Sequence, residues 1–266
     1  MKFSIVTISF NQARFLERAI TSILDQDYPD IEYIVVDPGS TDGSREIIER
    51  YRQRIAKIIY EPDNGPADGL NKGFAAASGE IFGFINSDDE LLPGAVSRMA
   101  GHFSAQPQTD ILMGNMFIID EQGRKMRRSY TDKFNRRVFA YSAGITCQQA
   151  TFFRAGLFRS TKRFDVNNSI TWDAELFLDL LLNAVHPLYV PDFIGGFRVY
   201  RGSITGANKM RDKYRAYERA RFERIMGRPW CMIDWFFWVL YRAYKYIANP
   251  HALIELLQRG SIGRMG

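Results

Sequence analysis

The stretch Phe84-Ile85-Asn86-Ser87-Asp88-Asp89 decides how the rest of the chain is interpreted. It continues the apolar run Glu80-Ile81-Phe82-Gly83 and ends in two adjacent carboxylates, the pattern of a buried strand that delivers acid to a sheet edge. In an open α/β sheet, ligands bind outside the carboxyl ends of the strands, and two hard oxygen donors there suit Mg²⁺ or Mn²⁺ carrying a diphosphate. The competing interpretation is a cap for a helix that starts near Pro93, although one cap requires only one acid.

Strands and helices alternate before this stretch. We expect strands at residues 3–10, 31–36 and 57–60, because most of their positions are apolar or β-branched. After each of them, apolar residues recur at intervals of three and four and predict a helix that packs one stripe on a sheet. This alternation is typical of βαβ units, so the sequence predicts an α/β fold with a mainly parallel sheet.

Polar residues follow the ends of the four predicted strands, namely Ser9, Asp37, Asp63 and Asp88. A parallel arrangement places all four at one edge of the sheet. Any one of them alone would indicate only a turn or a cap, since loops are commonly polar. Together they predict a cleft for a nucleoside diphosphate, in which Asp37 accepts from a pyrimidine N–H and Ser9 bonds the base or ribose. Asp88 and Asp89 would hold ribose and metal.

Composition excludes several other classes of protein. The 266 residues are 46% hydrophobic, enough for a full core, and two cysteines are too few for a disulfide scaffold. Neither G-x-G-x-x-G after the first strand nor G-x-x-x-x-G-K-[ST] is present, which argues against a nicotinamide enzyme and a P-loop kinase. The chain starts on a strand-like run without the pattern of a signal peptide, so we expect a cytoplasmic location.

Four segments together resemble glycosyltransferase family 2 in their order and spacing, over about residues 1–205: 4–11, 35–44, 68–73 and 86–89. The resemblance implies a GT-A-like (Rossmann-like) fold, a nucleotide-sugar donor, a divalent metal (Mg²⁺ or Mn²⁺) and inversion at the anomeric carbon. It also assigns roles to the nucleotide-binding residues Asp37, Asp68, Asn71 and Lys72 and to the metal-binding acids Asp88 and Asp89. Asn86 stands where many members have the first acid of D-x-D, so the acid that ligates the metal directly is left open.

The second half of the predicted domain is expected to bind the acceptor. Residues 111–119 and 125–130 predict a hairpin that extends the parallel core with antiparallel strands, and 146–153 resembles a further strand of the family. Inverting transfer needs a carboxylate that takes the proton of the acceptor hydroxyl. The segment from Ile170 resembles the family pattern whose first acid is this base, which implies Asp173 for the role and Glu175 as second choice. The alternative role of Asp173 is a helix N-cap.

Residues 195–205 look like the family's loop that closes over the diphosphate, with Tyr200 where histidine is common. Arg198 or Arg201 would then neutralise the leaving diphosphate, because guanidinium pairs well with phosphate. The alternative is that both are surface charges.

The C-terminal segment is basic and aromatic. From residue 201 onward it holds 13 Lys or Arg and 5 Asp or Glu, a balance of +8, against a balance of +5 for the whole chain. Residues 209–226 alternate basic and aromatic side chains, and 230–247 are dense in Trp, Phe and Tyr. Because charges interrupt 230–247, an interfacial amphipathic helix on an anionic membrane fits better than a transmembrane span. An oligomer interface, or a helix folded back on the catalytic domain, is the alternative.

The predicted organisation is a domain over 1–205, with a donor half to residue 100 and an acceptor half after it, followed by a helical appendage over 206–266.

The predicted function is transfer of a sugar from a UDP- or dTDP-sugar to a hydroxyl of a glycan or lipid-linked acceptor, in the synthesis of cell-surface polysaccharide or glycolipid. A non-catalytic nucleotide-sugar-binding relative would lack the metal acids or the base. A sugar nucleotidyltransferase would carry a glycine-rich basic loop after the first strand, where Asn11-Gln12-Ala13-Arg14 stands. Nucleic acid is not expected as a partner, since only the tail combines basic and aromatic residues.

Overall fold

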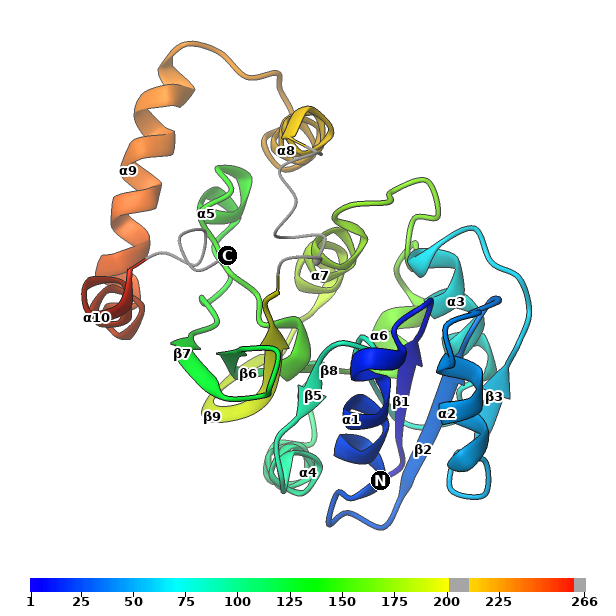
Figure 1. Cartoon of the computed structure of the whole chain (residues 1–266). Helices are drawn as coiled ribbons and strands as arrows, with labels where there is room; N and C mark the ends of the chain where they lie inside the picture. Colours follow the sequence, from blue (N-terminus) through cyan, green and yellow to red (C-terminus); the bar gives the residue numbers. More distant parts are fainter. Residues whose placement is uncertain (201–210, 261–266) are drawn as a thin grey trace. The chain divides into compact units, whose positions relative to one another are not determined.

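The computed structural model describes residues 1–200 and 211–260 (Figure 1). The chain divides into two units: Met1–Met116 with Gln148–Phe197 form the first, and Phe117–Cys147 with Arg198–Gly266 form the second. The predicted domain boundary between residues 205 and 206 lies outside the described residues.

The first unit begins with alternating strands and helices, as the sequence predicts. They are β1 (Phe3–Ile8), α1 (Ala13–Leu24), β2 (Ile31–Val36), α2 (Ser44–Arg50), β3 (Lys57–Ile59), α3 (Pro66–Ala76) and β4 (Ile81–Phe84). Strand β1 pairs in parallel with both β2 and β4, and β2 pairs in parallel with β3, which gives the order β3-β2-β1-β4. Figure 1 shows β1, β2 and β3 side by side. The predicted mainly parallel α/β sheet is therefore confirmed for this half.

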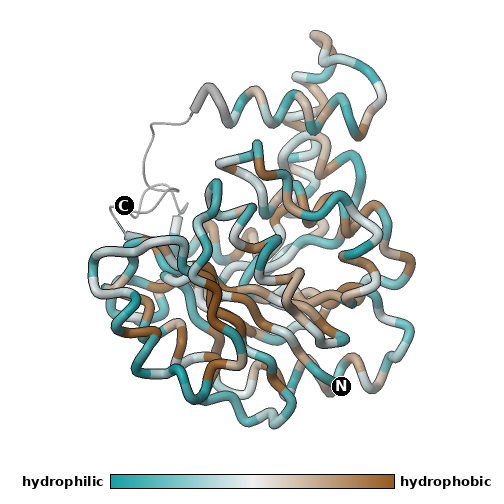
Figure 2. Tube along the Cα trace, turned by 90° about the vertical axis from the view of Figure 1, so that its right-hand side faces the viewer, coloured by the Kyte–Doolittle hydropathy of each residue, from teal (hydrophilic) through white to brown (hydrophobic). Residues whose placement is uncertain are grey.

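Strands β1, β2 and β4 are buried because both of their faces are covered. Ile5, Val6 and Ile34 have no exposed surface, and Figure 2 shows brown hydrophobic segments running through the middle of the tube. Helix α3 lies very close to β1, since a Cβ on Gly73 would stand 2.5 Å from Cγ1 of Val6. A larger residue at position 73 would push α3 off the sheet.

The remaining elements of this unit extend the sheet with antiparallel strands. They are β5 (Glu90–Leu91), α4 (Ala95–Ala105), β6 (Ile111–Ile119), the 3₁₀ turn η1 (Gln148–Ala150), β8 (Thr151–Arg154), α6 (Ala155–Arg159), α7 (Trp172–Asn183) and β9 (Pro187–Arg198). Strand β8 pairs antiparallel with both β4 and β6, and β5 pairs antiparallel with β9.

Two local predictions differ from the structure. The strand expected over 146–153 starts only at Thr151, because η1 occupies the preceding residues. Residues 195–198 belong to β9 and not to a closing loop, since Gly195 and Gly196 pair with β5 and a Cβ on Gly195 would stand 2.6 Å from the carbonyl oxygen of Gln149. The rest of that predicted loop, 201–205, lies outside the described residues.

Aromatic side chains join the start of α7 to the end of β4. The ring of Phe84, the last residue of β4, lies 5.8 Å from Trp172 and 6.0 Å from Phe177 of α7. Leu176, Leu180 and Phe177 face the core, as predicted. The first turn of α7 is thereby held beside the carboxyl end of β4, where the acidic stretch begins.

Among the residues that the structure describes, the second unit consists of β7 and four helices, in addition to the ends of β6 and β9. They are β7 (Lys125–Ser129), α5 (Arg136–Ala140), α8 (Arg211–Met226), α9 (Ile233–Ala248) and α10 (Pro250–Arg259). Strand β7 pairs with β6 across a turn in which Gly123 has a φ of +82°, so the predicted hairpin is present. In the part of the chain that the structure describes, no helix has the length and apolar character needed to cross a bilayer.

Candidate active site

The loops after β1 and β2 are joined by hydrogen bonds in both directions. The Asn11 amide N–H donates to Ser40 Oγ (2.8 Å), and the Thr41 N–H donates to Asn11 Oδ1 (2.9 Å). The Ala13 N–H donates to Asp42 Oδ2 (2.9 Å). Gly43 supplies the left-handed backbone (φ +97°) that starts α2 at this point. The segment from Asp37 to Ser44 is therefore a rigid floor at the carboxyl ends of β1 and β2.

One carboxylate oxygen of Asp37 holds this floor together, and the other has no hydrogen-bond partner. Its Oδ1 accepts from the N–H groups of Gly39 (3.1 Å) and Ser40 (2.8 Å) and from Nε of Arg45 (3.1 Å). The side chain has no exposed surface, yet its Oδ2 has no hydrogen-bond partner. Arg45 also lies over the ring of Tyr60 at 4.6 Å, which fixes its guanidinium beside Asp37.

Two more buried oxygens at this edge have no hydrogen-bond partner, Ser9 Oγ and Asn86 Oδ1. Ser9, Asp37 and Asn86 follow β1, β2 and β4, which are adjacent strands in the sheet. A buried polar atom without a partner is expensive in free energy, and such atoms commonly mark a position where a ligand supplies the missing bond. Three of them at one sheet edge indicate a polar ligand that runs across β2, β1 and β4.

The loop after β3 and the start of α3 carry the other predicted nucleotide-side residues. Asp63 accepts from the Gly65 N–H (2.9 Å), and burial raises the pKa of its carboxyl. Asp68 accepts from the Asn64 N–H (3.0 Å), and that hydrogen bond holds the pKa of Asp68 below its usual range. Lys72 Nζ lies 3.4 Å from Asp68 Oδ2 and donates to the Pro62 carbonyl. These contacts shape the loop that follows β3.

Asn71 has a different set of partners. Its side-chain amide donates to the Phe164 carbonyl (2.9 Å) and accepts from the Phe164 N–H (3.2 Å). Asn71 thus fastens the segment before α7 to helix α3, which helps to fix the position of the predicted base.

The two acids after β4 have different surroundings. Asp89 is 1% exposed, and its Oδ2 accepts from Nε2 of Gln149 (2.7 Å) and Nδ2 of Asn86 (3.2 Å). Asp88 is half-buried, at the tip of the turn. Gln148 donates to the carbonyl of Phe84 (2.5 Å) and so ties the same turn to η1. Asp89 is therefore held by the amides of Gln149 and Asn86, and Asp88 precedes it in the same turn.

The donor set fits a divalent cation that has few protein ligands. Within residues 1–200 and 211–260, no three His, Cys, Asp or Glu side chains gather as a group that could hold a metal. Mg²⁺ in nucleotide sites typically takes one or two carboxylates and completes its shell with phosphate oxygens and water. Asp88 and Asp89, in the turn that follows β4, supply two carboxylates of this kind.

Asp173 lies in the first turn of α7, as predicted. Its Oδ1 accepts from the Ala174 N–H (2.8 Å), and burial raises the pKa of this carboxyl. Glu175 accepts from Nδ2 of Asn168 (2.8 Å) in the loop that precedes the helix. A raised pKa suits a carboxylate that must take a proton, and the role of Asp173 as base stays a prediction.

Arg198 belongs to the second unit, and it is not a surface charge. Its side chain is 1% exposed, and its Nη1 donates to the carbonyls of Asp120 (2.7 Å) and Glu121 (3.2 Å). These bonds fix the turn between β6 and β7. Arg201, the other predicted diphosphate ligand, lies outside the described residues.

Comparison with known proteins identifies the family. The model of glycosyl transferase family 2 matches residues 4–169, more than half of the chain. The chain belongs to glycosyltransferase family 2. The matched region contains the three unpaired oxygens, the acidic turn and the loop before α7, whereas Asp173 lies just beyond it.

Relatives of this family 2 glycosyltransferase share part of their length with it. An uncharacterised glycosyltransferase of Nostoc sp. is 37% identical over 138 residues, 47% of this chain and 43% of the relative. A GalNAc(5)-diNAcBac-PP-undecaprenol beta-1,3-glucosyltransferase of Campylobacter jejuni is 37% identical over 102 residues, 37% of this chain and 33% of the relative. The chain thus matches less than half of the length of these two relatives.

Solved structures confirm the GT-A-like fold of this family 2 glycosyltransferase. S. aureus TarS 1–349 in complex with UDP-GlcNAc aligns over 97% of this chain and 73% of its own, with a TM-score of 0.66 and 20% identity. The mannosyltransferase PcManGT from Pyrobaculum calidifontis, in complex with GDP-Man and Mn²⁺, aligns over the same shares with a TM-score of 0.63 and 19% identity. At this identity the likeness concerns the fold alone.

The structure adds residues that sequence reasoning missed. Arg45 contacts Asp37 from eight positions along the chain, and Gln149 contacts Asp89 from sixty positions away. The signal for Arg45 was present in the sequence, since a cation in the first turn of the following helix is within reach of a strand-end acid. No local pattern indicates the contact of Gln149, because it depends on the pairing of β8 with β4.

Proposed function

We propose that this chain is an inverting glycosyltransferase that moves a sugar from a UDP- or dTDP-sugar to a hydroxyl of a glycan or lipid-linked acceptor. The observation that carries the proposal is the row of buried oxygens without partners on Ser9, Asp37 and Asn86 at adjacent strand ends. A nucleotide has donors for each of them, the base N–H for Asp37 and ribose hydroxyls for the others. The nucleotide-sugar complexes of TarS and PcManGT support a donor of this class.

Asp88 is the direct carboxylate ligand of a Mg²⁺ or Mn²⁺ ion in this proposal, and Asp89 is a positioning residue that fixes the turn through Gln149 and Asn86. A divalent cation would supply electrostatic stabilisation of the diphosphate as it leaves. The complex of PcManGT with Mn²⁺ supports this class of cofactor. Asp63, Asp68 and Lys72 line the nucleotide side, where Lys72 adds a positive charge.

Asp173 is the general base in this proposal. Its carboxylate takes the proton of the acceptor hydroxyl while the hydroxyl oxygen forms a bond to the anomeric carbon. The bond from that carbon to the diphosphate breaks on the opposite face, and its electron pair leaves with the diphosphate. This single displacement inverts the configuration. The contacts of Phe84 with Trp172 support the assignment, because they hold the start of α7 beside the strand that delivers Asp88.

A lipid-linked acceptor is supported by the name of the C. jejuni relative, which describes transfer to an undecaprenol-linked glycan. Such an acceptor brings the reaction to a membrane surface, and residues 230–247 are the predicted contact with it. A role in cell-surface polysaccharide or glycolipid synthesis follows from the same class of acceptor.

A donor screen tests the proposal. The protein is incubated with Mn²⁺ or Mg²⁺ and a panel of nucleotide sugars, and release of nucleoside diphosphate and thermal stabilisation are measured. We expect release from one UDP- or dTDP-sugar, slowed by excess chelator and by Asp173→Asn. Glu175→Gln is the matched control, since it removes a neighbouring acid from the same helical turn. Nucleotide binding without turnover of any donor would favour a non-catalytic relative, and formation of a nucleotide sugar from a sugar phosphate would favour a nucleotidyltransferase.

A further inference from the structure

Helix α9 has an inverted distribution of side chains. Asp234 is fully buried and Lys245 is 11% exposed, whereas a continuous apolar surface faces outward. At 100° per residue, Asp234, Tyr241 and Lys245 share one face, and the opposite face is formed by Phe236, Val239, Leu240, Ala243 and Ile247. Phe236 is 61% exposed and Ile247 is 76% exposed. A helix on the surface of a globular protein normally turns its apolar face inward and its charged face outward.

The buried charges fix this orientation. Asp234 accepts two hydrogen bonds from Arg228, both 2.7 Å, and one from the Tyr141 hydroxyl (2.7 Å). The Arg228 guanidinium holds the pKa of Asp234 well below its usual range, so this carboxylate stays ionised. Lys245 Nζ lies 3.5 Å from Asp132 Oδ2 at the other end of the helix. Both ends of α9 are thus anchored by ion pairs, and a rotation that buried Phe236 and Ile247 would break them.

Helix α10 repeats the inversion. Glu255 is 5% exposed and accepts from the Arg128 N–H of β7 (2.8 Å), while Leu257 is 76% and Ile254 50% exposed. Two consecutive helices therefore bury their acids and expose their apolar side chains. Contiguous exposed apolar surface on a soluble domain marks a contact with something else.

The charges around this surface indicate what that contact is. Residues 214–260 contain eight Lys or Arg and four Asp or Glu, and two of those acids are the buried Asp234 and Glu255. Arg242 on α9 and Arg259 on α10 are exposed, and Arg259 also lies 3.5 Å from the Glu255 carboxylate. A second copy of this chain would bring together two surfaces that each carry an excess of positive charge, whereas anionic phospholipid headgroups would pair with that charge. Tryptophan rings and arginine side chains together are typical of the headgroup boundary of a bilayer.

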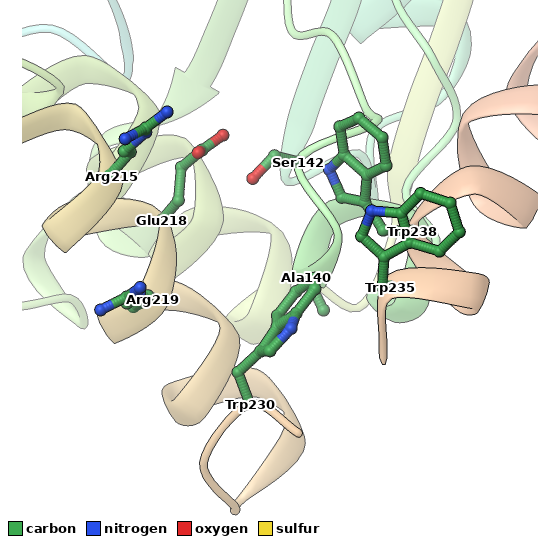
Figure 3. A pocket seen from close by; sticks show the side chains of 8 residues that line it. All are labelled: Ala140, Ser142, Arg215, Glu218, Arg219, Trp230, Trp235 and Trp238. Carbon is green, nitrogen blue, oxygen red and sulfur yellow. The ribbon is translucent and has the colours of Figure 1, made fainter. Parts of the chain in front are cut away.

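A cavity of about 330 Å³ adjoins this surface in the same unit (Figure 3). Its lining is formed by Ala140, Ser142, Arg215, Glu218, Arg219, Trp230, Trp235 and Trp238. Trp235 is 68% exposed and so belongs both to the cavity and to the outer surface of α9. The indole rings of Trp230, Trp235 and Trp238 give this cavity the amphipathic wall that interfacial residues offer to lipid.

We propose that the outward faces of α9 and α10 form a docking surface for an anionic lipid bilayer, into which Phe236, Leu240, Ile247, Ile254 and Leu257 insert to headgroup depth. The buried ion pairs hold the apolar side chains outward before the membrane is met. This docking rests on the proposed function, whose membrane contact it specifies, and it is measured without any donor or acceptor.

Vesicle flotation of the full-length chain tests this proposal. We expect co-flotation with vesicles of equal parts phosphatidylcholine and phosphatidylglycerol, and much weaker co-flotation with phosphatidylcholine alone. High salt should reduce binding only in part, since it screens the arginines but leaves the apolar contacts in place. The double variant Phe236→Gln with Ile247→Gln should lower binding by about tenfold or more, because it removes two large inserted side chains.

The matched control is Val166→Gln with Val185→Gln. These valines are 45% and 75% exposed in the first unit, so the control removes exposed apolar surface elsewhere on the chain. We expect it to bind vesicles as the unchanged protein does, and circular dichroism should show that both double variants are folded. Absence of co-flotation at low salt, or equal binding by the face variant, overturns the proposal. If sedimentation shows that the face variant converts a dimer to a monomer and neither protein binds vesicles, a second copy covers the surface and lipid docking is wrong. Nucleoside-diphosphate release, measured in parallel, reports separately on the transferase assignment.

Discussion

Replacement of Asp37 by asparagine tests the role of Oδ2, the carboxylate oxygen without a partner, separately from that of Oδ1, which holds the loop. The new side chain has nearly the same shape, and its carbonyl oxygen can still accept from Gly39, Ser40 and Arg45, as Oδ1 of Asp37 does. Its NH₂ group then takes the position of Oδ2, the oxygen without a partner. A buried acceptor is thereby changed into a donor, which faces the N–H of the base instead of accepting from it.

The expected loss of nucleotide-binding free energy is that of one hydrogen bond to a charged acceptor, about 1.5–3 kcal/mol. At 1.4 kcal/mol per tenfold change, the dissociation constant of UDP or dTDP should rise by about 10- to 100-fold. Isothermal titration calorimetry with each nucleotide measures this, and a thermal melt without ligand shows whether the fold is kept.

Asp42→Asn is the matched control from the same turn. Both oxygens of Asp42 are in use, since Oδ1 accepts from Ser44 and Oδ2 accepts from the Ala13 N–H. Burial alone would raise the pKa of Asp42, but these hydrogen bonds outweigh it and lower that pKa. We expect the control to lose about 0.5–2 kcal/mol of folding stability and to weaken nucleotide binding much less than Asp37→Asn does. If Asp37→Asn binds UDP and dTDP as tightly as the unchanged protein, the open oxygen does not read the base.

Three further predictions concern the acids. Asp173→Asn should keep nucleotide affinity and lower kcat by about 10²- to 10⁴-fold. Because burial raises the pKa of Asp173, acid should reduce the rate of the unchanged enzyme at a higher pH than for an enzyme with an ordinary aspartate as base. Normal turnover by Asp173→Asn, together with loss of turnover by Glu175→Gln, would reverse the two roles. In Asp88→Asn, activity should no longer respond to added Mn²⁺. Asp89→Asn should lose this response and also have a lower melting temperature, because Asp89 is buried among amide donors. Full activity of both variants would contradict a metal site here. Glu32, buried and hydrogen-bonded by Ser4 and Ser78, has its pKa lowered from 4.5 to about 2 against the opposing effect of burial. Its contribution of about 3 kcal/mol is therefore present above pH 4.5 and lost as the pH falls toward 2, and Glu32→Gln should remove this part of the pH dependence in urea titrations.

Local patterns in the sequence predicted most elements of the first unit. Strands β2 and β6 have the predicted bounds, and β1, β3 and β4 differ by one or two residues at their ends, because a continuous apolar run ends where the first polar residue must reach solvent or a ligand. The parallel order then places Ser9, Asp37 and Asp88 at one edge without further information.

What the sequence did not predict depends on contacts between distant residues. The amides of Gln148 and Gln149 find their partners in Phe84 and Asp89, sixty or more positions earlier, and these contacts accompany a 3₁₀ turn where a strand was expected. The burial of Arg198 is of the same kind, since its acceptors are carbonyls of the turn after β6. The roles of Asp88, Asp89 and Asp173 in the reaction stay predictions.

The hydrogen bonds between the loops after β1 and β2 have a consequence for protein engineering. Ser40 and Asp42 bond backbone groups of the first loop, and Asn11 returns a bond to the second. A chimera that takes only one of these loops from a relative would leave unmatched donors on the other and distort the floor on which Asp37 stands. Transplantation of base preference between members of the family should therefore succeed when residues 9–13 and 37–45 are exchanged as a pair.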